Sequence, residues 1–394
     1  MTGVARAAEY APARDRPTWI AYVQLSLFAS FLYAFGATQA LLRDEQGTTR
    51  SVAGLHGTAL AIGGLLGAML TTTVIERWGR GVVMRASAIA TAISILVYST
   101  PSAALPVSLA GAALACFFGT LLLISINAFL LDDQGNAGPA ALTEANALAS
   151  LAGLIGPLAV GIGAATVLGW RTGLWVLVVA LLALEAWRGR NLAVFGTRGL
   201  AAHEDAPGRL PRHVLWTLGM LMCFLGAEFC LTFWGADLLR EQCGFGPAAA
   251  AASLGTITGG MLVGRLIGSR LAQRVPTEAL LKGSILVALA SFALVWSFTA
   301  WPVVLLGLFL TGVGIGVHWP LGVARAVRDS GGMTDRASAS ASIAGSIAIG
   351  VAPIVLGLAS DTIGFHRAFL LVPALLVVGL VIVVIRPVPD ATRQ

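Results

Sequence analysis

Charged residues are scarce in this sequence. Only 11% of its 394 residues are charged, whereas 57% are hydrophobic and the mean hydropathy is +0.84. Soluble domains carry about 25% charged residues, and a chain with so much less charge cannot cover its own surface in water. The composition therefore excludes an ordinary soluble protein and predicts a polytopic helical membrane protein.

Motifs of soluble enzymes and of metal sites are also missing. The four cysteines form no C-x-x-C pair and three lie in apolar runs, so we expect neither a disulfide framework nor a metal site. No Walker sequence occurs, which argues against direct drive by ATP. GVGIGVHWP at 312–320 lies inside an apolar run, where close helix packing is expected, and HEDAP at 203–207 lacks the second histidine of a zinc protease. With no nucleophile, base and orienting group at one depth, we expect no cofactor and no enzyme.

Long apolar runs take the place of these motifs. A helix needs about 20 apolar residues to cross a bilayer, and runs of that length recur between breaks of Gly, Pro and charge. The first run is too long for the core of a signal peptide, so we interpret it as a retained helix. The sequence predicts twelve transmembrane helices, at 18–42, 51–75, 80–100, 104–131, 142–167, 170–188, 213–239, 247–272, 277–299, 301–325, 337–360 and 364–386.

A polar interval near the middle of the chain divides these helices into two groups. We predict an N-terminal six-helix bundle at 1–188, a cytoplasmic linker at 189–212 and a C-terminal six-helix bundle at 213–394. Nineteen of the 25 Lys and Arg residues fall on the side of the linker and the tails, five fall on the other side, and one lies within a span. The positive-inside rule then places both termini in the cytoplasm, in the cell inner (plasma) membrane. These basic residues account for the formal charge of +6 without nucleic acid as a partner.

The two halves of the chain resemble each other. A shift of 197 residues aligns Gly63 with Gly260 and Gly67 with Gly264, in the second predicted helix of each half. A repeat of half the chain length predicts two pseudo-symmetric bundles with a binding site between them near the bilayer midplane.

A short basic motif follows the second predicted helix. ERWGR at 76–80 resembles the loop between helices 2 and 3 of the major facilitator superfamily, written G-x-x-x-D-R-x-G-R-R. Glu76 stands for the aspartate, and Arg77, Gly79 and Arg80 match. With twelve spans, a central linker and two repeats, the resemblance covers essentially the whole chain and implies the fold of that family. It also implies gating, because charge-assisted hydrogen bonds at this rim can form in one state and break in the other; alternatively, the loop only fixes the topology.

A glycine-proline motif lies in the fifth predicted helix. SLAGLIGPLAVGIGA at 150–164 resembles a signature of proton-coupled exporters in that family. Gly156 and Pro157 remove a backbone hydrogen bond and let neighbouring backbones approach, so they are candidates for gating as well as for ordinary packing. Exporters also tend to carry an arginine in helix 4, and LAGAALACFFGTLLLISINAFLLDD has none. The first feature favours efflux and the second favours uptake.

The C-terminal half has few titratable residues inside its spans. They are Glu228 in helix 7, Arg265 in helix 8 and His318 in helix 10, with Asp237 near the outer end of helix 7. At about 1.5 Å of rise per residue, Glu228 lies close to mid-depth of its span. Arg265 and His318 each lie about 7–8 Å toward the cytoplasm from the centre of their span. The family resemblance implies that helices 7, 8 and 10 line the central cavity, where these side chains can meet.

Two interpretations of Glu228 are open. Intramembrane charge usually marks a transport path, so Glu228 is a candidate proton carrier, with His318 and Asp237 as further candidates for proton coupling. Arg265 and His318 are also candidates for substrate binding. Alternatively, Glu228 and Arg265 form a structural ion pair that neutralises two buried charges.

The N-terminal half offers two polar candidates for substrate binding. They are Tyr33 in helix 1 and Asn127 in helix 4, and either of them can instead serve only to bond a neighbouring helix. The sequence thus predicts a proton-coupled secondary transporter that moves a small organic solute by alternating access, with efflux slightly favoured. The alternatives are proton-linked uptake of a nutrient and, in a different class, a membrane-embedded enzyme or a receptor. The expected partners are the substrate, protons and membrane lipid, and we expect a monomer.

Overall fold

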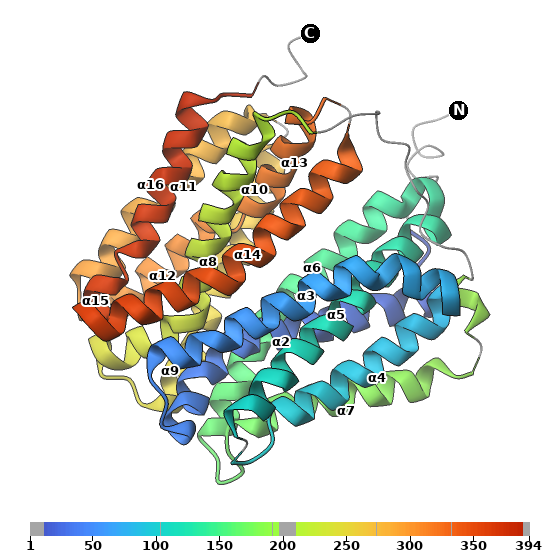
Figure 1. Ribbon diagram of the computed structural model, residues 1–394, viewed down its shortest axis with the longest axis horizontal. Helices are drawn as coiled ribbons and strands as arrows, with labels where there is room; N and C mark the ends of the chain where they lie inside the picture. Colours follow the sequence, from blue (N-terminus) through green and yellow to red (C-terminus); the bar gives the residue numbers. More distant parts are fainter. Residues whose placement is uncertain are drawn as a thin grey trace. The chain divides into compact units, whose positions relative to one another are not determined.

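The computed structural model of the chain is built from helices (Figure 1). It describes residues 12–102, 104–190, 192–196, 210–272, 274–331 and 333–388, and these ranges contain no strand. Eleven helices in the described part are long and apolar enough to cross a membrane. α7 (Arg171–Arg188) is the remaining predicted span, and its 18 residues have charged side chains at both ends. The all-α membrane fold is therefore confirmed, with a helix at each predicted span.

The helix bounds follow the predicted spans to within a few residues. The longer helices are α2 (Arg16–Gln46), α3 (Arg50–Trp78), α4 (Arg80–Tyr98), α5 (Leu105–Gln134), α6 (Gly138–Ala164), α7, α8 (Val214–Cys243), α10 (Gly255–Leu271), α11 (Thr277–Ser297), α12 (Trp301–Ile315), α14 (Thr334–Ile363) and α16 (Leu371–Ile385). The shorter helices are α9 (Pro247–Ser253), α13 (His318–Asp329), α15 (Phe365–Ala368) and the 3-10 turns η1 (Gly135–Ala137) and η2 (Ala193–Phe195).

Three predicted spans are interrupted. Predicted helix 8 consists of α9 and α10, helix 10 of α12 and α13, and helix 12 of α15 and α16. Pro373, near the start of α16, accounts for the last interruption, because proline has no backbone N–H and its ring clashes with the carbonyl four residues earlier. Hydropathy averages over such interruptions, so the apolar runs alone do not indicate them.

The repeated glycines are sites of close helix packing. A Cβ atom built on Gly63 of α3 would lie 2.7 Å from the carbonyl carbon of Ala113 on α5, and one on Gly260 of α10 would lie 2.9 Å from that of Phe309 on α12. Only glycine lets two helix backbones approach so closely. The pairs α3–α5 and α10–α12 therefore pack in the same way, as the internal repeat predicts.

Contacts between Cα atoms divide the chain into two compact units. The first contains Met1–Ala34 and Ile62–Ala202, and the second contains Phe35–Ala61 and His203–Gln394. The second unit therefore includes parts of α2 and α3. The predicted boundaries of the two six-helix bundles stay a prediction, and residues 197–209 of the predicted linker lie outside the described residues.

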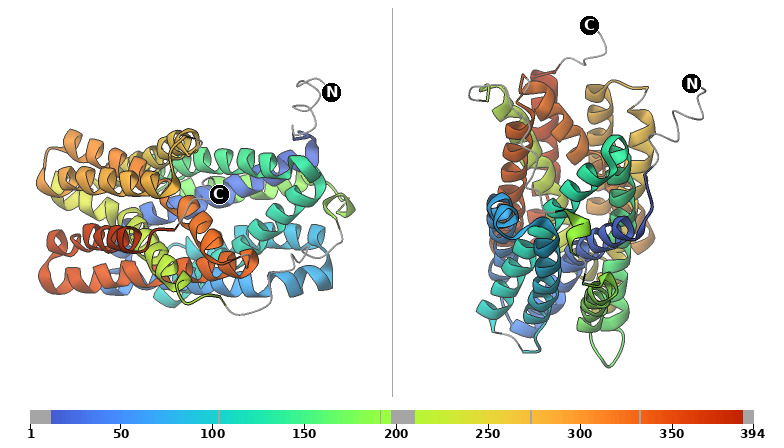
Figure 2. Two further views of the ribbon diagram at one scale, coloured as in Figure 1. Left: turned by 90° about the horizontal axis from the view of Figure 1, so that it is seen from above. Right: turned by 90° about the vertical axis from the view of Figure 1, so that its right-hand side faces the viewer.

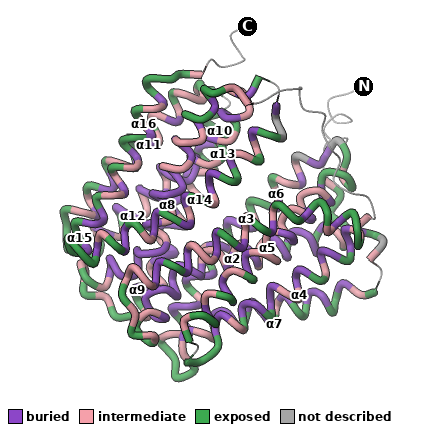
Figure 3. Tube along the Cα trace, viewed as in Figure 1, coloured by how far each residue is buried: buried purple, intermediate pink, exposed green. Residues whose placement is uncertain are grey.

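Each unit has its own buried residues (Figure 3). In the first unit, apolar side chains of α2, α4, α5, α6 and α7 form a core together with Phe195 of η2. In the second unit, α8 packs against both α14 and α16, which lie beside it (Figures 1 and 2). Because most of α8 is buried, a charged side chain in its middle has little access to water.

Candidate functional site

Glu228 lies in the middle of α8 and is buried. Its exposed fraction is 8%, and its backbone carbonyl accepts a hydrogen bond of 3.0 Å from Thr232 Oγ1. The positive charge of Arg265 acts on the carboxylate, but no direct ion pair joins Glu228 and Arg265 in the described part of the chain. A buried carboxylate is costly without close compensation. The proton-carrier role of Glu228 and its structural pairing with Arg265 therefore both stay predictions.

Arg265 of α10 contacts the place where predicted helix 10 is interrupted. Its Nε donates a hydrogen bond of 3.2 Å to the carbonyl oxygen of Gly316, which follows the last residue of α12. The last carbonyls of a helix have no partners within that helix and form the negative end of its dipole. The guanidinium therefore compensates the end of α12. Discontinuous helices of this kind form ion and substrate sites in other secondary transporters.

Glycines bring α12 close to its neighbours at this interruption. A Cβ atom on Gly312 would lie 3.1 Å from the carbonyl carbon of Ile257 on α10. One on Gly316 would lie 2.5 Å from the carbonyl oxygen of Met261, also on α10. The close packing predicted for GVGIGVHWP is therefore confirmed, and it holds the end of α12 within reach of Arg265.

His318 is the first residue of α13, directly after the interruption. Its ring is only 1% exposed and packs on the ring of Phe224, with centroids 4.4 Å apart and planes inclined by 30°. Neither ring nitrogen has a hydrogen-bond partner among the described residues. Phe224 precedes Glu228 by one helical turn on α8. The second unit thus connects the helices of Glu228, Arg265 and His318, while the roles of these residues in proton coupling and substrate binding stay predictions.

Asp237 takes part in an ion cluster at the C-terminal end of α8, which we call the α8 ion cluster (Arg43, Asp44, Asp237 and Arg240). Asp237 is 2% exposed, and its carboxylate lies 2.7 Å from a guanidinium nitrogen of Arg43. Arg43 also contacts Asp44 at 3.4 Å, and Arg240 contacts Asp44 at 2.7 Å. A cavity of about 360 Å³ lies beside the cluster. Asp237 is therefore held by an arginine at the end of the helix; its predicted part in proton coupling stays a prediction.

The partners of Asp237 were not predicted from the sequence. Arg43, Asp44 and Arg240 all occur within a few residues of a predicted helix end, where charged residues are ordinary. Nothing in their spacing shows that the ends of α2 and α8 adjoin. The only signal was that Asp237 lies within a predicted span and therefore needs compensation.

The predicted gating motif, which we call the rim motif (Glu76, Arg77, Gly79 and Arg80), lies at the junction of α3 and α4. Gly79 has φ +79°, a conformation that favours glycine, and it separates the two helices. Arg80 is buried and its Nη2 lies 2.6 Å from Oδ2 of Asp132 on α5. Glu76 and Arg77 are exposed, and the Arg77 guanidinium lies 5.9 Å from the ring centroid of Trp78. Arg80 is thus the buried member of the motif and forms an ion pair with the exposed carboxylate of Asp132, and the gating role stays a prediction.

Two further buried titratable residues, Glu185 of the first unit and His56 of the second, were not among the predicted site residues. Glu185 of α7 lies 3.3 Å from Arg188 and 3.3 Å from Arg85, and Gln24 donates a hydrogen bond to it. His56 of α3 was missed as well; it is buried, and its Nδ1 lies 3.1 Å from the carbonyl oxygen of Ala53. Both residues were visible as titratable letters inside predicted spans.

The glycine-proline motif packs against α2. A Cβ atom on Gly153 of α6 would lie 2.5 Å from the Tyr33 ring, and one on Gly156 would lie 3.1 Å from the methyl group of Ala34. Tyr33 therefore has a packing contact in the first unit, and Pro157 lies inside α6 without ending it. These contacts agree with ordinary packing and leave the predicted gating role of Gly156 and Pro157 untested.

Asn127 of α5 is half-buried. Its Oδ1 has no hydrogen-bond partner among the described residues. Buried amide oxygens are normally paired, which keeps this side chain a candidate for binding a polar ligand. Its predicted part in substrate binding, like that of Tyr33, stays a prediction.

Comparison with known proteins agrees with this architecture. The family model of the Major Facilitator Superfamily matches residues 18–330. An uncharacterized MFS-type transporter of Yersinia pestis is 26% identical over 270 residues, which cover 66% of this chain and 67% of that protein.

Solved structures show the same fold at low sequence identity. A bacterial homologue of the human lysosomal transporter Spinster has a TM-score of 0.76 at 12% identity, with 93% of this chain and 95% of that chain covered. The nucleoside transporter NupG has a TM-score of 0.74 at 13% identity, covering 93% and 98%. The fucose:proton symporter of E. coli has a TM-score of 0.63 at 18% identity, covering 94% and 98%. With a family model that matches most of the chain, this protein belongs to the Major Facilitator Superfamily of multi-pass membrane transporters.

Proposed function

We propose that this transporter couples the movement of a small organic solute to protons, and that Glu228 carries the proton. The observation that supports this most strongly is a buried carboxylate at the middle of α8 that has no direct ion pair in the described part of the chain. Such a group can accept and release a proton as its access to water changes. Arg265 lies near enough to act on it electrostatically, so protonation of Glu228 changes the charge balance at the interrupted helix 10.

The direction of transport is the finer part of this proposal. Efflux in exchange for protons is supported by the glycine-proline motif around Pro157. Proton-linked uptake is supported by the charged side chains of Glu228 and Arg265 in the spans and by the lack of an arginine in the described helix α5. One of the similar structures is itself named as a proton symporter. We keep efflux as the first candidate and uptake as the second, with both termini in the cytoplasm of the cell that carries the protein in its inner membrane.

The experiment begins with a panel of labelled solutes and purified protein in liposomes with an imposed pH gradient. A solute that accumulates is then tested with the variant Glu228→Gln. The glutamine side chain keeps the shape of glutamate but cannot ionise. We expect proton-driven accumulation to vanish while exchange of labelled for unlabelled solute continues. Glu241→Gln is the matched control, because Glu241 lies on the same helix but is half-exposed at its end. Efflux and uptake are distinguished by the direction of the pH gradient, inside relative to outside, that drives transport of the solute.

Two results contradict the proposal. A stable Glu228→Gln protein that still concentrates solute with the pH gradient excludes Glu228 as the proton carrier. If Glu228→Gln instead fails to fold and the double variant with Arg265→Met restores both folding and proton-driven transport, the pair is structural, since loss of one partner of a buried pair costs about 3–5 kcal/mol.

We also propose that the rim motif controls the rate of the conformational change. Arg77 and Glu76 are exposed at the end of α3 and far from the middle of the spans. Alanine at either position is expected to lower the transport rate while the affinity for substrate stays within a few-fold. A variant with normal turnover and lost binding would contradict this role.

A further inference from the structure

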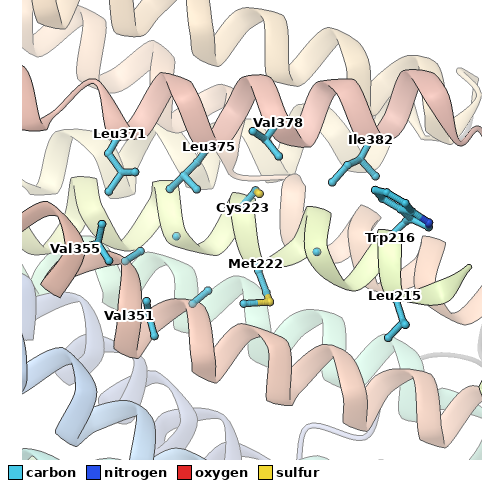
Figure 4. A pocket seen from close by; sticks show the side chains of 14 residues that line it. Leu215, Trp216, Met222, Cys223, Val351, Val355, Leu371, Leu375, Val378 and Ile382 are labelled. Carbon is cyan, nitrogen blue, oxygen red and sulfur yellow. The ribbon is translucent and has the colours of Figure 1, made fainter. Parts of the chain in front are cut away.

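An apolar groove runs along α8 in the second unit (Figure 4). Its floor is α8, and its walls are α14 and α16, with a cavity volume of about 450 Å³. The lining is almost entirely apolar, with Val351 of α14 on one wall and Val378 of α16 on the other. Both valines are exposed, so the groove is open along its length to whatever surrounds the protein. This groove, which we call the α8 groove, lies on a part of the second unit that the candidate proton site does not use.

The floor of the α8 groove has room for more atoms than the chain supplies. A Cβ atom built on Gly219 would meet nothing within 4 Å, in contrast to the glycines that pack helices together. At the far end, a Cβ atom on Gly226 would lie 3.2 Å from Leu375 and Ala352. The groove is therefore open at Gly219 and narrows toward Gly226.

The length of the groove matches one leaflet of a bilayer. On α8 it extends from Leu215 to Gly226 and on α16 from Leu371 to Ile382. Eleven helical steps rise about 16 Å, which is about half of the ~30 Å thickness of the hydrocarbon core. Since α8 spans Val214–Cys243, the groove begins at one end of the helix and stops near its middle. A helix from a second protein copy would cross both leaflets, so this length fits a single acyl chain better.

The mouth of the groove at the N-terminal end of α8 is aromatic and basic. Trp216 is 52% exposed there, beside Ile382 (Figure 4). The guanidinium of Arg386 lies 5.8 Å from the centroid of the Trp216 ring. Arg212, four residues before Trp216 in the chain, is exposed. Tryptophan side chains favour the membrane–water interface, and basic residues next to a span attract anionic headgroups. The positive charge at the mouth thus complements a phosphate, and the apolar groove complements a hydrocarbon chain.

We propose that the α8 groove binds one acyl chain of an anionic phospholipid, with the headgroup phosphate at Arg386. The chain lies against Gly219 and ends near Gly226, two residues before Glu228 along α8. This lipid site is separate from the proposed proton site and does not depend on which solute is transported.

The test uses purified protein in phosphatidylcholine vesicles that contain brominated phosphatidylglycerol or, in a parallel series, brominated phosphatidylcholine. Bromine on the acyl chain quenches nearby tryptophan, and the signal of Trp216 is the difference between the wild type and Trp216→Phe. We expect brominated phosphatidylglycerol to quench Trp216 at a mole fraction about fivefold lower, the effect of one basic residue at an anionic surface. Arg386→Gln should make the two lipids equal.

Gly219→Leu should remove the quenching preference, because its side chain fills the open floor of the groove. Gly283→Leu is the matched control: a Cβ atom there also meets nothing within 4 Å, but Gly283 lies on α11, outside the groove. Equal quenching by the two lipids in the wild type, or a preference unchanged by Gly219→Leu, would overturn the site. If Trp216→Phe does not fold, native mass spectrometry of the wild type and Gly219→Leu answers the same question. We expect one retained phosphatidylglycerol in the wild type and none in the variant, and equal retention would overturn the site.

Discussion

Replacement of Gly260 by alanine tests how the second unit holds its interrupted helix. The new methyl carbon would lie 2.9 Å from the carbonyl carbon of Phe309 and 3.1 Å from Cα of Gly312, whereas ordinary contact begins at 3.4 Å. α10 and α12 must therefore separate by at least about half an ångström. Overpacking of this kind costs about 1–3 kcal/mol. Because α12 ends at the carbonyl that accepts from Arg265, the separation also weakens that hydrogen bond.

Gly283→Ala is the matched control for Gly260→Ala. Both residues lie inside helices, but a Cβ atom on Gly283 meets open space, so alanine there should stabilise α11 by up to about 1 kcal/mol. Unfolding by SDS titration of protein in mixed micelles, followed by circular dichroism, measures the difference. We expect Gly260→Ala to unfold at a lower SDS fraction than the wild type and Gly283→Ala at an equal or higher one. Equal midpoints for the two variants would refute the packing argument, and Gly63→Ala should repeat the loss in the first unit.

Two further predictions concern ion pairs. Asp237→Asn removes the carboxylate that lies 2.7 Å from Arg43. Loss of one partner of a buried pair costs about 3–5 kcal/mol, and we expect the lower end because Arg43 keeps Asp44 as a second carboxylate neighbour. An unchanged SDS midpoint of unfolding would contradict the pairing. Asp132→Asn removes an ion-pair partner of buried Arg80 and should lower the melting temperature in detergent. Asp133→Asn should not, because Asp133 is equally exposed but forms no ion pair in the described part of the chain, and equal melting temperatures would show that the Arg80 pair contributes nothing.

The span positions could be predicted because they depend on local sums. A helix crosses the bilayer when about 20 consecutive residues are apolar enough, and this requires no knowledge of neighbouring helices. The repeated glycines were also visible, since Gly63 and Gly260 recur at a fixed distance in the chain. The reason for glycine at these two positions became visible only in the fold, where each glycine approaches the backbone of another helix.

The candidate site was only partly predictable. Glu228, Arg265 and His318 stood out as titratable letters in apolar runs, but their partners did not. That Arg265 bonds the carbonyl of Gly316 depends on an interruption of helix 10 that hydropathy does not register. Likewise, the packing of His318 on Phe224 depends on which faces of α8 and α13 adjoin.

By itself, the sequence determined that this chain is a helical membrane protein, where its helices cross, and which few residues carry charge at membrane depth. These properties follow from the cost of placing polar groups in hydrocarbon, which each segment meets on its own. The tertiary structure decided which charges pair, as Asp237 does with Arg43, and which glycines pack and which stay open, as Gly260 and Gly219 do. Such choices depend on distances between helices that are far apart in the chain, and only the packing of the helices sets those distances.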